Sequence, residues 1–380
     1  MGNSFPTRSA SPAQLGRTHD PCFKWKIHDF SVLLERGAMP INSALFHFSG
    51  HKWFLRVTPS HKKFFAVPPY VALSLGLSVG SLDLEPDYTI EAAFVLAIYN
   101  HSNGLYYGSE ASYMFHINNT NSTLECLIPL KELLKSPGFL AGDCCVFGVE
   151  ILKVDVFPHE KEAVVVQKKA PTVQNLFIQK NGFVTRNCTL TMSNFLELNL
   201  KHFVRSAMFE IDGHKWYLGI YPRGDQYSTS YLSLYLCMDA SDKLPPESGK
   251  LVELSLSIMD QKHGQHYTRK SPALVVFAGE CRWGWSNFIP LSIFRDPSSG
   301  YLVRSCCIVK AEITTVGSSN GGEVLADGKM NLLNCDPNSS TGLTRRSTIG
   351  VGVALTSTRT STTHLLVLQR FMYCPLIYPI

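Results

Sequence analysis

The sequence predicts an all-β fold in which two antiparallel β-sandwiches follow each other along the chain. Three observations predict it: an internal repeat, an alternation of apolar and polar residues with a period of two, and a scarcity of helical periodicity. The 380 residues are enough for two domains of about 100–200 residues each. Hydrophobic residues make up 45% of the chain and charged residues 17%, a balance that is typical of packed domains.

The internal repeat is the strongest of these observations. Residues 44–55 resemble residues 207–218, and both segments contain the sequence Gly-His-Lys-Trp. Residues 70–75 resemble residues 231–236, the sequence Ile-Pro-Leu occurs in both halves, and each half has a Cys-Cys pair. The similar segments follow one another in the same order, which indicates two copies of one structural unit.

The first repeated segment is predicted to be a β-hairpin. Phe46 and Phe48 alternate with a polar residue before the turn, and Trp53 and Leu55 alternate after it. In the second copy the turn is Asp-Gly at residues 212–213. Both residue types tolerate the positive φ angles that two-residue hairpin turns require. We expect both tryptophans of the repeat to lie in the cores.

The segments that follow are predicted to be further strands. Apolar residues occupy every second position over 71–79 and 232–238, which places one face of each strand on a core and the other outside. Residues 94–98 and 254–258 have a similar character, and residues 131–134 and 291–294 are predicted to form single helical turns. Many short strands separated by turns indicate antiparallel sandwiches.

The repeat divides the chain into five predicted parts. We expect a flexible N-terminal arm over 1–20, a first sandwich domain over 21–157, a linker over 158–183 and a second sandwich domain over 184–316. Residues 317–380 have no counterpart in the repeat and are rich in Gly, Ser, Thr and Asn. We expect them to form a low-complexity, poorly ordered tail.

The composition argues against several classes of function. The net charge of +5 is not gathered in a basic stripe, so no nucleic-acid partner is expected. The eleven cysteines contain no Cys-x-x-Cys pair, and neither a metal site nor a cofactor is predicted. The phosphate-binding Gly-rich loop, the His-Glu-x-x-His motif and a local Cys-His signature are all missing from the sequence, so we predict no catalytic residue and no enzyme activity.

The same reasoning predicts the location of the protein. The first twenty residues lack the apolar stretch of a secretion signal. No segment reaches the run of about 20 apolar residues that a membrane span needs. We therefore expect a cytoplasmic protein without a membrane partner, with the nucleus as the alternative location.

The repeated motifs resemble the MATH domain, the meprin and TRAF homology fold. The resemblance rests on Trp-x-Ile-x-x-Phe at 25–30, Gly-x-x-Trp at 50–53 and 213–216, Tyr-Leu-Ser-Leu-Tyr-Leu at 231–236, and Trp-Gly-Trp followed by Phe-Ile-Pro-Leu within 283–291. It covers residues 23–156 and 184–316, and the tandem layout is similar to a group that is common in plants. It implies eight-stranded TRAF-like sandwiches that bind short extended peptides along one sheet, by strand addition or a closely related mode.

In the second copy, the resemblance implies a peptide groove at Tyr235, Leu254, Val275, Trp283 and Trp285. Alternation places Tyr235 on the outer face, with packing against a neighbouring strand as the alternative. The two tryptophans flank a glycine and can share one face, with core packing as the alternative. Alternation favours a core role for Leu254. Val275 stands where the family has an aromatic residue, which implies a preference for small apolar ligand side chains.

In the first copy, the matching positions hold mostly residues that are not aromatic, namely Ser74, Phe94, Met114, Ser122 and Leu124. Phe94 is the one aromatic candidate for peptide binding there. We therefore expect recognition by the first copy to be weaker or different.

These observations predict a non-catalytic adaptor that binds short linear motifs of other proteins, mainly through the second copy. A link to ubiquitin pathways is implied by the resemblance alone. One alternative is an oligomerisation scaffold whose domains pair with each other or with other MATH-domain proteins, without motif binding. A further alternative is a carbohydrate-binding sandwich, because jelly-roll lectins also display aromatic residues on their sheets.

Overall fold

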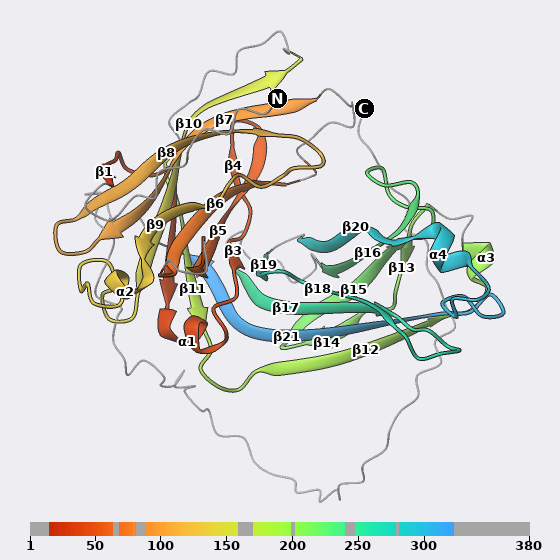
Figure 1. The fold of residues 1–380 in the computed structure, drawn as a ribbon. Helices are drawn as coiled ribbons and strands as arrows, with labels where there is room; N and C mark the ends of the chain where they lie inside the picture. The colour runs from red at the N-terminus through yellow and green to blue at the C-terminus, as the bar shows by residue number, and fades with distance from the viewer. Residues whose placement is uncertain are drawn as a thin grey trace, which may run out of the picture. The chain divides into compact units, whose positions relative to one another are not determined.

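The computed structural model describes residues 15–63, 68–78, 80, 88–158, 170–198, 202–239, 248–278 and 281–322. These residues form two β-sandwiches, module 1 (residues 15–158) and module 2 (residues 184–322), with a connecting segment at 170–183 (Figure 1). The predicted all-β fold class is confirmed. Residues 1–14 of the expected arm and residues 323–380 of the expected tail lie outside the described residues.

Module 1 packs two antiparallel layers against each other. The first layer contains, in spatial order, the strands β1 (Gly16–Arg17), β8 (Leu105–Phe115), β7 (Thr89–Asn100), β10 (Cys145–Phe157) and β2 (Phe23–His28). The second layer contains β3 (Ile41–Asn42), β4 (Phe46–Phe48), β5 (His51–His61), β6 (Tyr70–Leu77) and β9 (Glu125–Pro129). Two short helices, α1 (Phe30–Glu35) and α2 (Leu130–Leu133), connect strands of the module.

Module 2 repeats this arrangement. One layer contains β12 (Val184–Met192), β21 (Cys307–Gly321), β17 (Gly249–Ile258), β18 (Tyr267–Lys270) and β19 (Leu274–Ala278). The other contains β13 (Val204–Arg205), β14 (Phe209–Ile211), β15 (His214–Tyr221), β16 (Tyr231–Met238) and β20 (Arg282–Pro290). The helices of this module are α3 (Phe195–Leu198) and α4 (Leu291–Arg295).

The two predicted hairpins form at corresponding places in the modules. Ser49 and Gly50 join β4 to β5 with φ angles of 48° and 78°, and Asp212 and Gly213 join β14 to β15 with 51° and 76°. Two successive positive φ angles are the signature of the turn whose twist matches that of paired strands. The local sequence therefore determines the register of both hairpins.

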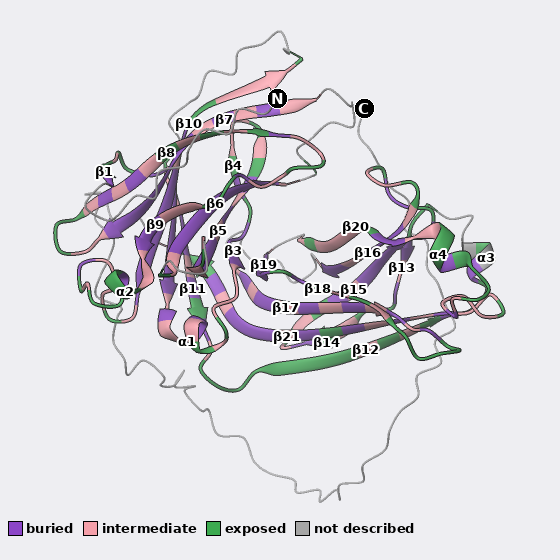
Figure 2. Ribbon diagram, in the orientation of Figure 1, coloured by how far each residue is buried: buried purple, intermediate pink, exposed green. Residues whose placement is uncertain are grey.

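Each hairpin places one tryptophan in a core, as predicted. Trp53 and Trp216 are fully buried, and each indole Nε1 donates a hydrogen bond to a backbone carbonyl of its own hairpin, at 3.1 and 3.3 Å. Each ring also meets a buried phenylalanine edge-on, Phe115 in module 1 and Phe277 in module 2. Figure 2 shows these buried interiors between the layers of the sandwiches.

The structure corrects three of the boundaries expected from the repeat. Gly16 and Arg17 of the expected arm pair with β8. Residues Thr172–Ile178 of the expected linker form a strand, β11. Strand β21 continues as far as Gly321, beyond the expected end of the second domain at residue 316. Comparison of the two copies could not reveal β1 and β11, because neither has a counterpart in the other copy. The end of β21 does have one, since the offset between the Cys-Cys pairs aligns residues 155–157 of β10 with residues 317–319.

The helices of the described chain are short. They contain between four and six residues, and none of them has the length and apolar character needed to cross a bilayer.

His28 at the end of β2 is expected to make the stability of the fold dependent on pH. Its ring stacks on Phe177 of β11, with centroids 4.3 Å apart. Burial, reinforced by the positive charge of Lys26, lowers the pKa of His28 from 6.5 to about 4, although Asn175 and Asp29 act in the opposite direction. The unfolded chain therefore binds a proton at a higher pH than the folded chain does. This group should reduce the free energy of unfolding as the pH falls from about 6.5 towards 4, and have no effect above that window.

Urea unfolding of the protein and of a His28→Gln variant, each at about pH 7.5 and about pH 5, measures this effect. We expect the variant to lose less stability on acidification than the unchanged protein does. An equal loss in both proteins would assign the pH dependence to other groups.

Candidate functional site

Strand β20 forms one border of the second layer of module 2. Within the described residues its hydrogen-bonded neighbour strand is β16, and its other side pairs with no strand. The border of a sheet presents backbone N–H and C=O groups that can pair with another extended chain. We define residues 282–286 of β20, with the side chains on both faces of this segment, as the binding edge.

The register between β16 and β20 assigns the predicted aromatic residues to two different faces. Trp285 and Trp283 lie opposite the buried Leu234 and Leu236, whereas Tyr235 lies opposite the glycine between the tryptophans. Opposed residues of an antiparallel pair point to the same side of the sheet. The two tryptophans therefore share the inward side of the layer, and Tyr235 lies on the outward side.

The inward side of the binding edge, called the tryptophan face, is aromatic and bordered by a cation. The rings of Trp283 and Trp285 meet edge-on at 4.8 Å, and both are half-buried beside the core of module 2. The guanidinium carbon of Arg269 lies 5.0 Å from the centre of the Trp285 ring, and its Nη1 donates to the carbonyl oxygen of Asn287 at 2.7 Å. Half-buried rings at a strand border can contact an apolar ligand side chain.

The outward side, called the tyrosine face, is a network of hydrogen bonds. The hydroxyl of Tyr235 donates to Oδ2 of Asp225 at 2.5 Å, and the backbone N–H of Tyr227 donates to Oδ1 at 3.0 Å. Asp225 is only 3% exposed. Nη1 of Arg282 donates to the hydroxyl of Tyr221 at 3.0 Å, and its guanidinium carbon lies 5.2 Å from the centre of the Tyr235 ring. The network fixes the orientation of Tyr235.

The two tyrosine hydroxyls of this face remain protonated at neutral pH. Burial raises the pKa of Tyr235 far above its usual value, and the hydrogen bond to Asp225 and the negative charge of that carboxylate raise it further. Burial also raises the pKa of Tyr221, although the nearby Arg282 acts in the opposite direction. Arg282 therefore presents a positive charge on this face that no ionised tyrosine neutralises.

A second set of bonds ties the Asp225 loop to the binding edge. The hydroxyl of Ser233 accepts the N–H of Asp225 at 3.0 Å and donates to the carbonyl oxygen of Ser286 at 2.6 Å. These bonds lie where the register between β16 and β20 shifts, at a bulge-like irregularity between Leu232 and Leu234. Bulges turn the local direction of a strand and commonly occur next to functional sites. Ser233 therefore links the Asp225 loop to β20 through hydrogen bonds.

Gly284 allows Tyr235 to lie close to the binding edge. A Cβ atom at this position would lie 2.2 Å from the carbonyl oxygen of Leu234 and 2.9 Å from Cδ1 of Tyr235. The nearest of these atoms belongs to the backbone and cannot give way easily. The glycine between the two tryptophans is therefore required by the approach of the neighbouring strand.

Three of the predicted binding residues lie in the cores instead. Leu254 is 2% exposed and Val275 is 5% exposed, both within the core of module 2, and Phe94 is fully buried in the core of module 1. Leu254 and Phe94 occupy inward positions of alternating strands, whereas Val275 lies on a strand that is buried on both faces. The structure therefore corrects the expectation that these side chains line a peptide-binding surface, and leaves Tyr235, Trp283 and Trp285 beside the binding edge.

The positions of module 1 that correspond to the binding edge, where the structure describes them, do not form an equivalent site. Ser74, at the position of Tyr235, is 1% exposed. The ring of Phe54 lies over Gly76 on the same strand, where a Cβ would meet its Cζ at 2.1 Å. Ser122, at the position of Trp283, accepts the N–H of Leu75 at 3.0 Å. The corresponding face of module 1 is therefore covered by its own side chains.

Sequence reasoning missed four residues of the binding edge. Alternation along β15 and β20 could have assigned Tyr221 and Arg282 to the face of Tyr235. Each of them is next to a residue that points inward, Ile220 in β15 and Trp283 in β20. Asp225 lies in a turn after β15, and Arg269 lies on the opposing layer. No periodic signal could have connected these two residues with the site.

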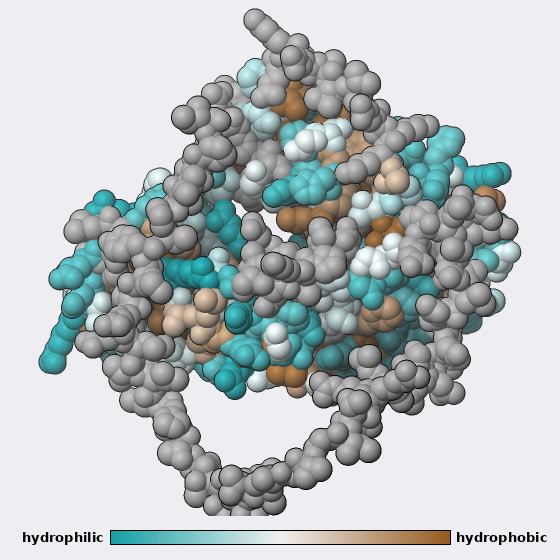
Figure 3. Space-filling model, turned by 180° about the vertical axis from the view of Figure 1, so that it is seen from behind, coloured by the Kyte–Doolittle hydropathy of each residue, from teal (hydrophilic) through white to brown (hydrophobic). Residues whose placement is uncertain are grey.

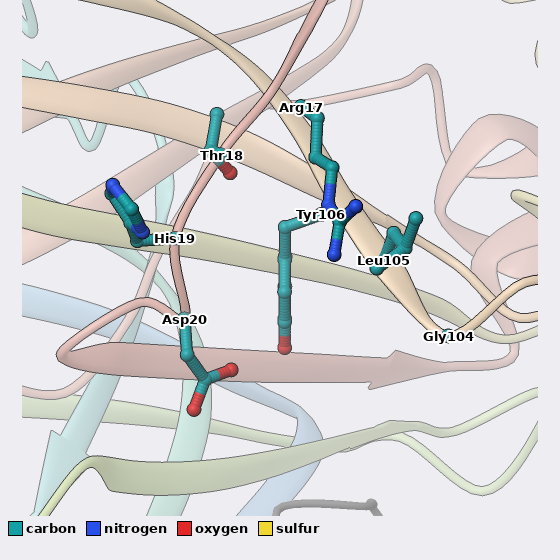
Figure 4. Close-up of a pocket in the computed structure, with 7 residues that line it drawn as sticks. All are labelled: Arg17, Thr18, His19, Asp20, Gly104, Leu105 and Tyr106. Carbon is teal, nitrogen blue, oxygen red and sulfur yellow. The ribbon is translucent and has the colours of Figure 1, made fainter.

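A separate pocket of about 420 Å³ lies in module 1 (Figure 4). The segment before β2 and the turn between β7 and β8 line it, with Arg17, Thr18, His19, Asp20, Gly104, Leu105 and Tyr106. Asp20 is bound by the buried Lys24 at 2.7 Å. The hydroxyls of Thr18 and Tyr106 are buried without a protein partner. Such groups are satisfied by solvent or by a small polar molecule, and they do not form a nucleophile paired with a base.

Seven cysteines of the described chain have thiols that burial keeps protonated. Burial raises the pKa of Cys22 and of Cys237 to about 11, and it also raises the thiol pKa of Cys126, Cys145, Cys188, Cys281 and Cys307. A catalytic thiol needs a lowered pKa. Within the described ranges, no group of three His, Cys, Asp or Glu side chains is arranged to hold a metal ion.

Exposed apolar side chains are spread over several parts of the molecule. Met208, Met114 and Leu134 are 54%, 51% and 49% exposed and come from different segments of the chain. On the face drawn in Figure 3, apolar areas alternate with polar ones. Singly exposed apolar residues are usual on protein surfaces and do not by themselves define a binding site.

Comparison with known proteins identifies the repeated unit. A family model described as the MATH domain matches residues 22–151 and 187–313, one match in each module. Ubiquitin C-terminal hydrolase 12 of Arabidopsis thaliana is 35% identical over 130 residues, which are 34% of this chain and 11% of the hydrolase. TNF receptor-associated factor homolog 1a of the same plant is 32% identical over 132 residues, 34% of this chain and 12% of the relative.

A MATH domain and coiled-coil domain-containing protein of Arabidopsis thaliana is 29% identical over 122 residues, which are 32% of this chain and 40% of that protein. The chain thus spans about a tenth of the length of the hydrolase and of the receptor-associated factor homolog. In all three relatives the similarity has the length of a single module.

Proposed function

The chain belongs to the MATH domain family, a protein-interaction fold, and we propose that it is a non-catalytic adaptor that binds short extended peptides along the binding edge of module 2. The observation that carries this proposal is the border strand β20, which among the described strands pairs with β16 on one side only and has different chemistry on its two faces. A peptide added beside β20 gains backbone hydrogen bonds, and its side chains supply specificity.

The two faces suggest a pattern for the ligand. Successive side chains of an extended peptide point to opposite sides. One set would meet the half-buried rings of Trp283 and Trp285, which favour apolar side chains. The other set would meet the tyrosine face, where Arg282 supplies a positive charge and the carboxylate of Asp225 is already occupied by two donors. We propose a motif in which apolar residues alternate with acidic or polar residues.

The names of two relatives suggest the pathway of the partners. One is called a ubiquitin C-terminal hydrolase and the other a TNF receptor-associated factor homolog, and both share the MATH region with this chain. We propose that the partners belong to ubiquitin-related pathways. A family member can retain the binding domain while differing in all other parts, so this step rests on analogy.

A peptide-display selection against the full chain tests the proposed function. We expect enriched peptides to share an extended motif, and a Trp285→Leu variant to bind them about thirtyfold more weakly, since large aromatic anchors contribute about 2 kcal/mol or more to binding. Leu124→Ala is the matched control, because Leu124 occupies the position of Trp285 in module 1 and is 36% exposed. Equal affinities of folded Trp285→Leu and the unchanged protein would contradict the proposal.

A further inference from the structure

The two modules are joined by a continuous sheet rather than by a loose connection. Strand β11 of the connecting segment pairs in parallel with β2 of module 1 and antiparallel with the last residues of β21 of module 2. The beginning of β19 pairs with β3 of module 1. The strands β2, β11, β21, β17, β19 and β3 are therefore neighbours in one sheet, and Figure 1 shows β21 running from one sandwich into the other.

Strand β19 contributes alternate side chains to two different cores. Leu274 and Val276 belong to the apolar core of module 1, whereas Val275 and Phe277 belong to the core of module 2. All four are buried, with exposed fractions of 5% or less. A strand with apolar side chains on both faces is a wall between two cores. Neither sandwich can be separated from this strand without exposing apolar side chains.

Other strands of module 2 and the connecting segment also complete module 1. Leu176 and Ile178 of β11, Leu251 of β17 and Val316 of β21 are all buried in the core of module 1. Val316 reaches it because the register of β17 and β21 shifts after Leu251. The buried Gln174 of β11 accepts the N–H of Ala44 at 3.2 Å. Module 1 alone would lack part of its core and would expose two sheet borders.

Charged groups add contacts between module 1 and both the connecting segment and module 2, but they are secondary. Arg36 of module 1 lies 3.5 Å from Glu253 of β17, and its guanidinium carbon lies 4.1 Å from the centre of the Phe183 ring. Lys180 lies 3.5 Å from Asp29. Ion pairs exposed to this degree contribute little to the free energy of unfolding, so the shared apolar cores are the main cause of the association between the modules.

We propose that residues 15–322 fold as one cooperative unit, in which module 1 positions the binding edge of module 2 instead of acting as a second peptide-binding domain. All described residues fall in one compact unit. Strand β3 of module 1 holds the start of β19, and β19 precedes β20, which carries Trp283 and Trp285. The cooperative unit follows from the fold alone. Its positioning role rests on the proposed function.

Fluorine NMR of the full chain labelled with 5-fluorotryptophan tests the cooperative unit. The chain has five tryptophans. Trp25 and Trp53 report on module 1, and Trp216, Trp283 and Trp285 report on module 2. In a urea titration, we expect the native resonances of all five to disappear with one common midpoint. Separate midpoints for the two sets would overturn the proposal.

Two matched core variants sharpen this experiment. Phe115→Leu weakens module 1 beside Trp53, and Phe294→Leu weakens module 2, where Phe294 packs edge-on against Phe195. We expect each variant to shift the midpoints of all five resonances equally. A shift of the Trp25 and Trp53 resonances alone in Phe115→Leu would show independent modules. If a variant does not fold, the titration of the unchanged protein still decides.

The positioning role has its own test with a peptide enriched in the selection. Ile41→Ala, in β3, is expected to weaken binding by about threefold to thirtyfold without touching the ligand. Unchanged affinity in the folded variant would overturn the positioning role while leaving the cooperative unit intact. Absence of any peptide binding by the unchanged protein would instead refute the proposed function, and the fluorine titration would remain decisive for the cooperative unit.

Discussion

Replacement of Trp216 by alanine is expected to lower the free energy of unfolding by about 3–5 kcal/mol. The indole is fully buried, meets Phe277 edge-on with ring centroids 5.1 Å apart, and donates a hydrogen bond to the carbonyl of Ile211. Alanine would leave a cavity and an unpaired carbonyl in the hairpin. Because Phe277 lies on the strand shared by both cores, we expect module 1 to lose stability together with module 2.

Urea denaturation followed by circular dichroism measures this loss of stability. Trp216→Phe is the matched variant, since it keeps a ring in the core but removes the Nε1 donor. We expect it to lower the free energy of unfolding by less than the alanine variant does. A loss smaller than about 1 kcal/mol for the alanine variant would contradict the assignment of Trp216 to a close-packed core.

Removal of the Asp225 carboxylate is expected to have the second largest effect, on both binding and stability. Asp225→Ala leaves the Tyr235 hydroxyl without its acceptor and the Tyr227 N–H without its partner. An unsatisfied buried polar group costs about 1–3 kcal/mol. Because Tyr235 would then lose its fixed orientation on the tyrosine face, we also expect affinity for a selected peptide to fall about tenfold, which corresponds to about 1.4 kcal/mol.

A double-mutant cycle with Tyr235→Phe isolates this interaction. Hydrogen bonds to charged groups contribute about 1.5–3 kcal/mol, so we expect a coupling energy of that size in the free energy of unfolding. Additive effects of the two substitutions would show that the 2.5 Å contact does not stabilise the protein, and the tyrosine face would then need another explanation.

Local patterns predicted the elements of each module well. The Asp-Gly turn at Asp212 and Gly213 has the expected positive φ angles, and Leu232, Leu234 and Leu236 are buried as alternation predicted. These features depend on neighbours along the chain and on one adjacent core. They could therefore be read from the sequence without knowledge of the other strands.

Features that depend on distant strands could not be predicted in this way. Strand β11 gave no repeat signal, because it pairs with β2 and β21 and has no counterpart in the first copy. Alternation correctly favoured a core position for Leu254, whereas family similarity suggested a groove position. For Val275 the decisive fact is that both faces of β19 are covered, each by a different core. A single alternating pattern does not contain this information.

The burial of the module 1 face that corresponds to the tyrosine face could not be predicted from local patterns either. Alternation along β6 predicted an outward side, yet Ala72 and Ser74 on that side are buried. The ring of Phe54 from the neighbouring strand lies over Gly76 and covers part of this side. Burial here depends on which large side chain lies opposite each small residue, and only the register of β5 and β6 determines that.

Backbone hydrogen exchange with and without an enriched peptide tests the binding edge most directly. We predict that the peptide slows exchange of amides within residues 282–286 of β20, because strand addition would pair the unpaired side of this strand. The amides of residues 121–125, the corresponding positions of module 1, should exchange at unchanged rates. Protection of residues 121–125, or peptide binding that leaves the amides of residues 282–286 unprotected, would contradict the account.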